Sequence, residues 1–284
     1  MRKSTVIIQL MVVMTSALWM LPGCMNRTSE TTDADSLQVD TLATDTVDSL
    51  SKMVDEMPIP ASADELFDDF FFTYAASRKV QNSRTLFPLK VMEYGKASVI
   101  EKQQWKVEHF FMKQGYYTLI FNGKRQLNSM KDTTVNNVIV ERINMVKSVV
   151  KQWHFLRSNG QWKLTDIKVM PLKEHADAAF LSFYQKFSSN AEFQQASLAE
   201  TVTFTGPDPE DDFSTMTGEI LPEQWPMFAP QLPTGTIYNI VYGVQEKTSS
   251  SIRYFLIRGI ANGLQTDLTF MKTNGKWKLT QVTT

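Results

Sequence analysis

The chain has 284 residues, of which 43% are hydrophobic and 21% are charged, and its formal net charge is −1. This composition is close to the globular average and excludes a chain that is disordered or collagen-like throughout. The balanced charge gives no sign of the clustered basic surface that nucleic-acid binding requires. The length is enough for about two ordinary domains.

The first predicted segment is an export signal at residues 1–23. Arg2 and Lys3 are followed by an apolar run from Val6 to Leu21, and this order is typical of a cleaved leader. The run is shorter than the ~20 residues of a membrane-spanning helix, and Pro22 would end a helix there. We therefore expect a leader that is removed and not a transmembrane anchor.

The cysteine that follows the leader predicts a lipid anchor. Leu21-Pro22-Gly23-Cys24 resembles the lipobox of bacterial lipoproteins, although Pro22 departs from the usual small residue. The resemblance implies diacylglycerol on the Cys24 sulfur, cleavage before Cys24 and acylation of the new amine. Several acyl chains would anchor the protein to a membrane almost permanently. The alternative is an ordinary secretory signal with an incidental cysteine.

Two further inferences depend on the same cysteine. Cys24 is the only cysteine, so no disulfide can form within the chain and the folded part must rely on ordinary cores. Met25 is not the aspartate that retains lipoproteins at the inner membrane of some bacteria. We therefore expect the outer membrane, with the periplasmic or surface face left open.

Residues 24–61 form a predicted tether that is acidic and rich in Ser, Thr and Asp. The segment from Met25 to Pro60 has no aromatic residue, so it cannot bury enough apolar surface to offset its ordering entropy. Its recurring Asp-Ser/Thr-apolar unit resembles the acceptor of Bacteroidetes O-glycosylation, which makes candidate sugar sites of Ser36, Thr41, Thr46 and Ser49. Two alternatives are chance in a biased composition and a short amphipathic helix between Val47 and Met57.

An internal repeat organises the rest of the chain into predicted domains at 62–172 and 173–284. The segment Asn159-Gly160-Gln161-Trp162-Lys163-Leu164 recurs 115 positions later as Asn274-Gly275-Lys276-Trp277-Lys278-Leu279. Earlier landmarks follow in the same order, and Phe67, Phe70 and Gln81 match Phe180, Phe183 and Gln194. A period of this length indicates a duplicated domain and not a solenoid.

Each repeat has the same predicted order of elements. An apolar stripe predicts a first helix at 66–74 and at 180–187. A second, shorter helix is predicted at 101–111, with an irregular, proline-containing counterpart at 221–228. Long strands follow and close on the Asn-Gly pairs, which favour tight hairpin turns. The apolar alternation slips after each turn, which predicts a bulge at the same place in both repeats.

This order of elements resembles the nuclear transport factor 2-like, or SnoaL-like, superfamily. Tandem copies behind a lipoprotein leader are similar to an uncharacterised family of Bacteroidales lipoproteins. The resemblance implies an α+β fold with two tandem cone-shaped (cystatin-like) domains, each with N-terminal helices packed on a curved antiparallel sheet. Because the large residues recur in both repeats, we expect Trp105, Trp225, Trp162 and Trp277 to pack in the cores.

No motif assigns a catalytic, cofactor-binding or metal-binding residue. His109, His154 and His175 have no partner at metal-ligand spacing, and we expect no cofactor. His109 could lie at a pocket mouth near Tyr117, but a surface position is favoured. The acidic segment 206–212 lacks the spacing of a calcium loop and is better interpreted as a solvated turn.

The residues favour a non-enzymatic envelope lipoprotein that binds an unknown ligand or an envelope protein. The alternative is a small-molecule enzyme of the isomerase, dehydratase or hydrolase type that uses one open cone. A third alternative is a purely structural spacer. Cones filled by Phe, Trp and Leu would favour binding or assembly, whereas an enzyme needs a cavity with convergent ionisable groups.

Overall fold

The computed structural model describes residues 64–243 and 251–284. The leader, Cys24 and the candidate sugar sites Ser36, Thr41, Thr46 and Ser49 lie outside these ranges. The described residues belong to one compact unit. None of their helices combines the length and the apolar character that crossing a membrane would require.

Each repeat has two helices followed by six strands, and the repeats differ in where one short helix lies: α5 follows the third strand of the first repeat, and α8 precedes the third strand of the second. The first contains α3 (Phe67–Ala76), α4 (Arg78–Arg84), β1 (Thr85–Glu93), β2 (Lys96–Ile100), β3 (Tyr116–Phe121), α5 (Lys124–Leu127), β4 (Asn137–Asn144), β5 (Val149–Ser158) and β6 (Gln161–Pro171). The second contains α6 (Ala178–Ser189), α7 (Ala191–Ala196), β7 (Leu198–Asp208), β8 (Asp211–Ile220), α8 (Trp225–Phe228), β9 (Thr236–Tyr242), β10 (Ile252–Gly259), β11 (Gln265–Thr273) and β12 (Lys276–Thr283). The predicted duplication is therefore visible in the order of elements.

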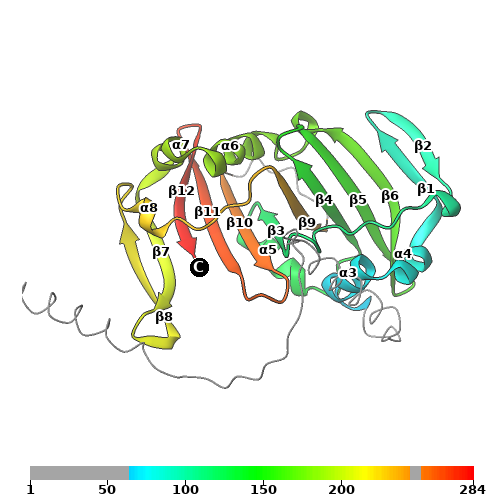
Figure 1. Ribbon diagram of the computed structural model, residues 1–284, viewed down its shortest axis with the longest axis horizontal. Coiled ribbons are helices and arrows are strands. Elements are labelled where there is room, and N and C mark those ends of the chain that lie inside the picture. Colours follow the sequence, from blue (N-terminus) through cyan, green and yellow to red (C-terminus); the bar gives the residue numbers. More distant parts are fainter. Residues whose placement is uncertain (1–63, 244–250) are drawn as a thin grey trace, which may run out of the picture. The chain divides into compact units, whose positions relative to one another are not determined.

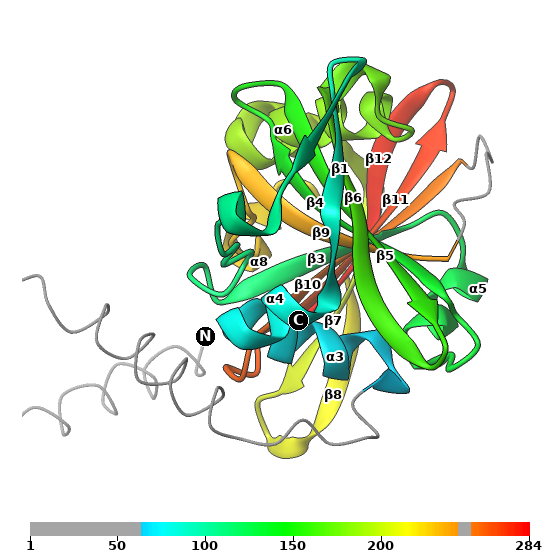
Figure 2. The same cartoon turned by 90° about the vertical axis from the view of Figure 1, so that its right-hand side faces the viewer.

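All twelve strands join one sheet in the order β2-β1-β6-β5-β4-β9-β3-β10-β11-β12-β7-β8 (Figure 1). The third strand of each repeat lies in the other repeat's half. Thus β3 pairs with β10 of the second repeat, and β9 pairs with β4 of the first repeat, both in antiparallel register. We call this arrangement the strand exchange. Figure 2 shows how the strands fan out, as expected when each strand is rotated relative to its neighbour.

The strand exchange changes the expected domain organisation. An α+β fold with helices packed on a large mixed sheet is confirmed. The finer expectation of two tandem cones, each with its own sheet, is not confirmed, because each half of the sheet contains a strand from the other repeat. At the centre, β3 and β9 are parallel neighbours that share one register pair, Thr118 with Asn239.

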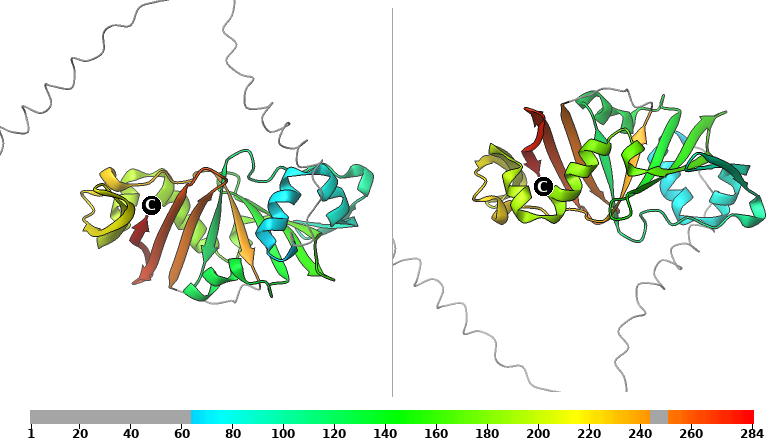
Figure 3. Two further views of the ribbon diagram at one scale, coloured as in Figure 1. Left: turned by 90° about the horizontal axis from the view of Figure 1, so that it is seen from below. Right: turned by 90° about the horizontal axis from the view of Figure 1, so that it is seen from above.

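The two hydrophobic cores lie on opposite faces of this sheet. Successive residues of a strand point to opposite faces. On β5, Trp153 belongs to the first core with α3, whereas Val150 belongs to the second core with α6. The same alternation on β3 places Leu119 in the first core and Ile120 in the second. In Figure 3, α3 and α4 lie in front of the sheet in the view from below, and α6 and α7 lie in front of it in the view from above.

The predicted helix stripes fill these cores. Phe67, Phe70, Phe71 and Tyr74 of α3 are buried, and Phe180, Tyr184 and Phe187 are buried on α6. In each repeat the first phenylalanine meets the hairpin tryptophan edge-on. The ring centroids are 5.0 Å apart for Phe67 and Trp162, and 5.3 Å apart for Phe180 and Trp277. The interiors of both halves are thus filled by aromatic side chains.

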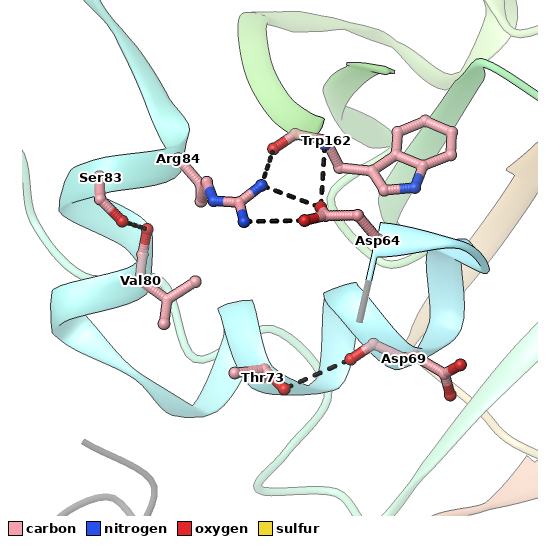
Figure 4. A network of polar contacts seen from close by, with 7 residues as sticks. All are labelled: Asp64, Asp69, Thr73, Val80, Ser83, Arg84 and Trp162. Carbon is pink, nitrogen blue, oxygen red and sulfur yellow. Dashed lines mark hydrogen bonds and ion pairs between the residues drawn. The ribbon is translucent and has the colours of Figure 1, made fainter. Parts of the chain in front are cut away.

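An ion pair at the start of α3 attaches this helix to the sheet (Figure 4). Arg84 donates to both carboxylate oxygens of Asp64 at 2.9 and 2.8 Å, and the same carboxylate accepts the backbone N–H of Trp162 at 3.1 Å. The equivalent aspartate of the second repeat, Asp177, instead pairs with Arg253 on β10 at 2.8 Å. Both repeats therefore keep the aspartate but use arginines from different elements.

The hairpin predictions are confirmed. Asn159 and Gly160 have φ of 51° and 73°, and Asn274 and Gly275 have φ of 51° and 79°. The pairing register slips between His154 and Phe155 and again between Thr269 and Phe270, which is the predicted bulge in both repeats. The hydroxyl of the extra residue, Thr165 or Thr280, donates to a carbonyl of the facing strand at 3.0 or 3.1 Å.

The prediction of a second helix in each repeat is largely wrong. Within 101–111 the structure has only a 3₁₀ turn at Lys102–Gln104, and the counterpart is the four-residue α8. Within 101–111, Trp105, Phe110 and Phe111 pack against the first core without lying on a helix. Of the four tryptophans expected in the cores, Trp162, Trp225 and Trp277 are buried, whereas Trp105 is half-buried at the edge of the first core.

Candidate functional site

A cavity of about 730 Å³ opens on the face of the sheet that carries the first core. Its floor is apolar and continues that core, while charged and tyrosyl side chains stand around it. The lining residues are Val91, Glu93, Tyr94, Ile100, Arg142, Asn144, Lys147, Val149, Lys151, Ile167, Val169, Thr236 and Tyr238. Thr236 and Tyr238 belong to β9, so the strand exchange places part of the second repeat in this wall.

Five of the lining residues form one row across five neighbouring strands. Register pairs connect Glu93 with Val169, Val169 with Lys151, Lys151 with Arg142, and Arg142 with Tyr238. Residues paired in this way point to the same face, with Cβ atoms roughly 5 Å apart. We call these five residues the cavity row. Its centre places two cations directly opposite each other, an arrangement that destabilises a sheet unless the charges are compensated.

One of the two cations has a carboxylate partner. Lys151 forms an ion pair with Glu108 and lies 4.6 Å from the centroid of the Trp153 ring. The backbone of Glu108 is held in turn by the buried amide of Gln81, which donates to the Glu108 carbonyl at 2.7 Å and accepts its N–H at 3.0 Å. The Lys151 ammonium group is therefore fixed in place and partly neutralised.

The other cation of the row, Arg142, has no carboxylate partner among the described residues. Within the described ranges, no carboxylate oxygen lies within ion-pair distance of Arg142 or of the nearby Lys147. Arg142 is exposed, and its register partner Tyr238 is half-buried. Burial raises the pKa of the Tyr238 phenol, and Arg142 offsets only part of this rise. The phenol therefore stays protonated at neutral pH and can donate a hydrogen bond.

In the described part of the second repeat, the equivalent positions form no such cavity row. The registers align Arg142 with Ile257, Lys151 with Thr266 and Tyr238 with Thr118, and these three counterparts are themselves neighbours on adjacent strands. All three counterparts are buried. The second repeat thus forms the same strands with small or apolar side chains at these positions, so the fold does not require the two cations.

A buried polar cluster lies on the opposite face, behind Arg142. Glu141 accepts hydrogen bonds from Gln152 at 2.6 Å and from Asn239 at 2.9 Å, and its Oε1 lies 2.9 Å from His175 Nε2. Burial opposes the ionised forms, but their mutual attraction lowers the pKa of Glu141 and raises the pKa of His175. In the neutral imidazole, the Nδ1 atom of His175 accepts the Asp177 N–H at 3.0 Å, and protonation of Nδ1 would give up this bond. The cluster is closed to solvent and serves the fold.

The histidines singled out from the sequence lie apart. His109 is exposed and lines no part of the cavity. His154 points away from Trp153, as expected, and its Nδ1 lies 3.3 Å from an Asp166 oxygen. Across 64–243 and 251–284, no three His, Cys, Asp or Glu residues are grouped so that they could hold a metal ion. Segment 206–212 contains the turn of the β7–β8 hairpin at 209–210, together with the adjoining ends of the two strands.

Sequence reasoning did not identify the cavity row. A usable signal was present, since Lys151 and Arg142 occupy inward-facing strand positions, two residues from the buried Trp153 and Val140. An inward-facing cation in one repeat, where the other repeat has an uncharged residue, indicates a local role beyond packing. Recognising it required the strand register of both repeats, which the hairpins alone do not provide.

Comparisons with known proteins agree with this architecture. Residues 46–284 match the family model described as "Domain of unknown function (DUF4348)". The solved structure of an NTF2-like protein from Bacteroides fragilis is 34% identical, with a TM-score of 0.72, over 80% of this chain and 98% of that one. A search of curated proteins gave no match. The chain therefore belongs to the DUF4348 family and has an NTF2-like fold.

Proposed function

We propose that this protein is a non-enzymatic binding module that is held to a bacterial envelope membrane by lipid on Cys24. The observation that carries the binding role is the cavity of about 730 Å³, which is built by strands of both repeats. A cavity of this size, with an apolar floor and a few polar groups around it, is the ordinary form of a small-molecule site.

The contents of the cavity favour binding over catalysis. The ionisable groups of its wall are three cations, the exposed Glu93 and two tyrosines. No His, Cys, Ser or Asp is among its lining residues, so the usual nucleophile–base pair is missing from this part of the described chain. The raised pKa of Tyr238 is also the wrong direction for a general base at neutral pH. The superfamily's isomerase, dehydratase or hydrolase chemistry is therefore the weaker alternative.

The binding role can be tested with a neutral fluorescent probe, N-phenyl-1-naphthylamine. We would use residues 25–284, which retain the compact unit Leu42–Thr284. Probe fluorescence should rise on binding, and Val149→Trp should abolish the rise by filling the cavity. The matched control is Val99→Trp, which adds the same bulk at an exposed valine outside this cavity. Binding that ignores both substitutions would count against the cavity as a ligand site.

The lipid anchor is a separate part of the proposal, based on the lipobox resemblance at Cys24. Cys24→Ala should prevent the incorporation of labelled palmitate and release or mislocalise the protein without unfolding it. The outer membrane is the expected location of the wild-type protein, and fractionation of intact cells tests it. Continued membrane retention of Cys24→Ala, with unchanged lipid labelling, would overturn the anchor and leave the binding role standing.

A further inference from the structure

We infer that the ligand of this cavity is an organic anion, with its negative group on Arg142 and Lys151 and an apolar body on the cavity floor. The inference rests on the proposed binding function and names the class of ligand. It follows from the charges of the cavity row and from the comparison of the two repeats.

The first step is the electrostatic balance of the cavity wall. Arg142, Lys147 and Lys151 line it, against the single carboxylate of Glu93. Glu93 is exposed at the far end of the cavity row, separated from Lys151 by Val169. The Glu108 carboxylate adds one negative charge but is committed to Lys151. The wall therefore keeps a net positive charge beside an apolar surface.

The second step is that folding does not explain the two cations. Lys151 and Arg142 face each other on adjacent strands, where like charges destabilise a sheet. The second repeat places Thr266 and Ile257 at the same register pair and forms the same strands. Cations that the fold neither needs nor fully neutralises are best explained by a negatively charged ligand between them.

The third step is geometry that suits a carboxylate or a similar oxyanion. Arg142 presents a planar guanidinium group that can donate two hydrogen bonds to such an anion. Its register partner on the other side, Tyr238, carries a phenol that stays protonated and can donate a third. The remaining contact surface is supplied by Val91, Ile100, Val149 and Ile167. The predicted ligand is thus one anionic head group on an apolar or aromatic body.

The test compares two probes with the same kind of aromatic body, one anionic and one neutral. The anionic probe is 8-anilinonaphthalene-1-sulfonate, and the neutral probe is N-phenyl-1-naphthylamine. Residues 25–284 should bind the anionic probe more tightly, and Arg142→Gln or Lys151→Gln should weaken it at least about fivefold while leaving the neutral probe unchanged. Lys102→Gln removes one charge from a different basic depression, formed with Arg78 and Lys79, and should change neither probe.

A second variant guards against misfolding. Arg142→Ile combined with Lys151→Thr copies the residues that the second repeat already accommodates at this register pair. Its circular dichroism and unfolding midpoint should match the wild type while its preference for the anion disappears. Equal binding of both probes, unaffected by any of these charge changes but blocked by Val149→Trp, would overturn the anionic ligand and leave the binding function intact. Binding of neither probe to the cavity would overturn both.

Discussion

Asn239 donates its side-chain amide to Glu141 at 2.9 Å, and this contact joins β9 of the second repeat to β4 of the first. The oxygen of the same amide accepts the backbone N–H of Ile120 on β3 at 3.0 Å. The amide nitrogen of Asn239 therefore contacts Glu141 on β4, and its amide oxygen contacts the other exchanged strand, β3. Since β3 and β9 share a single register pair, this side chain replaces part of the missing ladder between them.

Replacing Asn239 should therefore destabilise the whole sheet. Asn239→Ala leaves a Glu141 oxygen and the Ile120 N–H without their partners in a buried place, at a cost of about 2–4 kcal/mol of unfolding free energy. Denaturant unfolding followed by tryptophan fluorescence measures it. The control is Asn262→Ala, which removes an exposed amide bonded to the Gly115 carbonyl and should cost less than about 0.5 kcal/mol. Equal losses in the two variants would contradict a special role for Asn239.

The pair Glu141 and His175 predicts a pH dependence of stability. The pKa of Glu141 is lowered from 4.5, so its contribution is present above that value and is lost as the pH falls through the folded-state pKa. The pKa of His175 is raised from 6.5, so its contribution is complete below 6.5 and is lost as the pH rises through the folded-state pKa.

His175→Gln isolates the alkaline arm of this dependence. The unfolding free energy of the wild type should exceed that of the variant most at about pH 6, and the difference should shrink towards pH 9. The slope is at most about 1.4 kcal/mol per pH unit, which is the limit for one proton. Denaturant titrations at several pH values measure the difference. A difference that grows with pH would mean that His175 is buried in its neutral form.

The strand exchange can be tested by cross-linking. Asn144 on β4 is paired with Thr236 on β9, so Asn144→Cys with Thr236→Cys, in a Cys24→Ser background, should form a disulfide within the chain. Tyr116 is the first-repeat counterpart of Thr236 and would take its place if each repeat kept its own third strand. Asn144→Cys with Tyr116→Cys should therefore remain reduced. Peptide mapping of the oxidised proteins identifies the bond, and the opposite result would favour two unexchanged sheets.

Much of the local structure follows from the sequence. The Asn-Gly pairs adopt the positive φ that a tight hairpin requires, and the slipped alternation after each turn correctly predicts a bulge, which the structure places at Thr165 and Thr280. The helix stripes and the hairpin tryptophans pack as their spacing indicates. These features depend on a few neighbouring residues, and duplication confirms each of them by showing it twice.

The strand exchange and the cavity could not be predicted in the same way. Placing β3 beside β4 or beside β10 buries the same alternating side chains, so the hydrophobic pattern does not distinguish the two pairings. The partner of His175 could not be predicted from the sequence around it. Glu141 lies 34 residues away and comes close to His175 only when the sheet forms. The cavity row likewise depends on register across five strands.

The ion pair of Lys151 with Glu108 provides a prediction whose sign opposes that of the other cavity variants. Glu108→Gln keeps the size of the side chain and its backbone clamp on Gln81, but it removes the charge that partly neutralises Lys151. An anion in the cavity would then meet an uncompensated ammonium group, so its affinity should rise about two- to fivefold, as expected for a partly exposed charge. Titration with 8-anilinonaphthalene-1-sulfonate at low salt measures the change, and added salt should reduce it by screening. If Glu108 were only a structural support, Glu108→Gln would weaken this probe as Lys151→Gln does, because both would release the same side chain. Tighter binding of the anionic probe, with unchanged binding of the neutral probe, would instead show that the charge of Lys151 acts directly on the ligand.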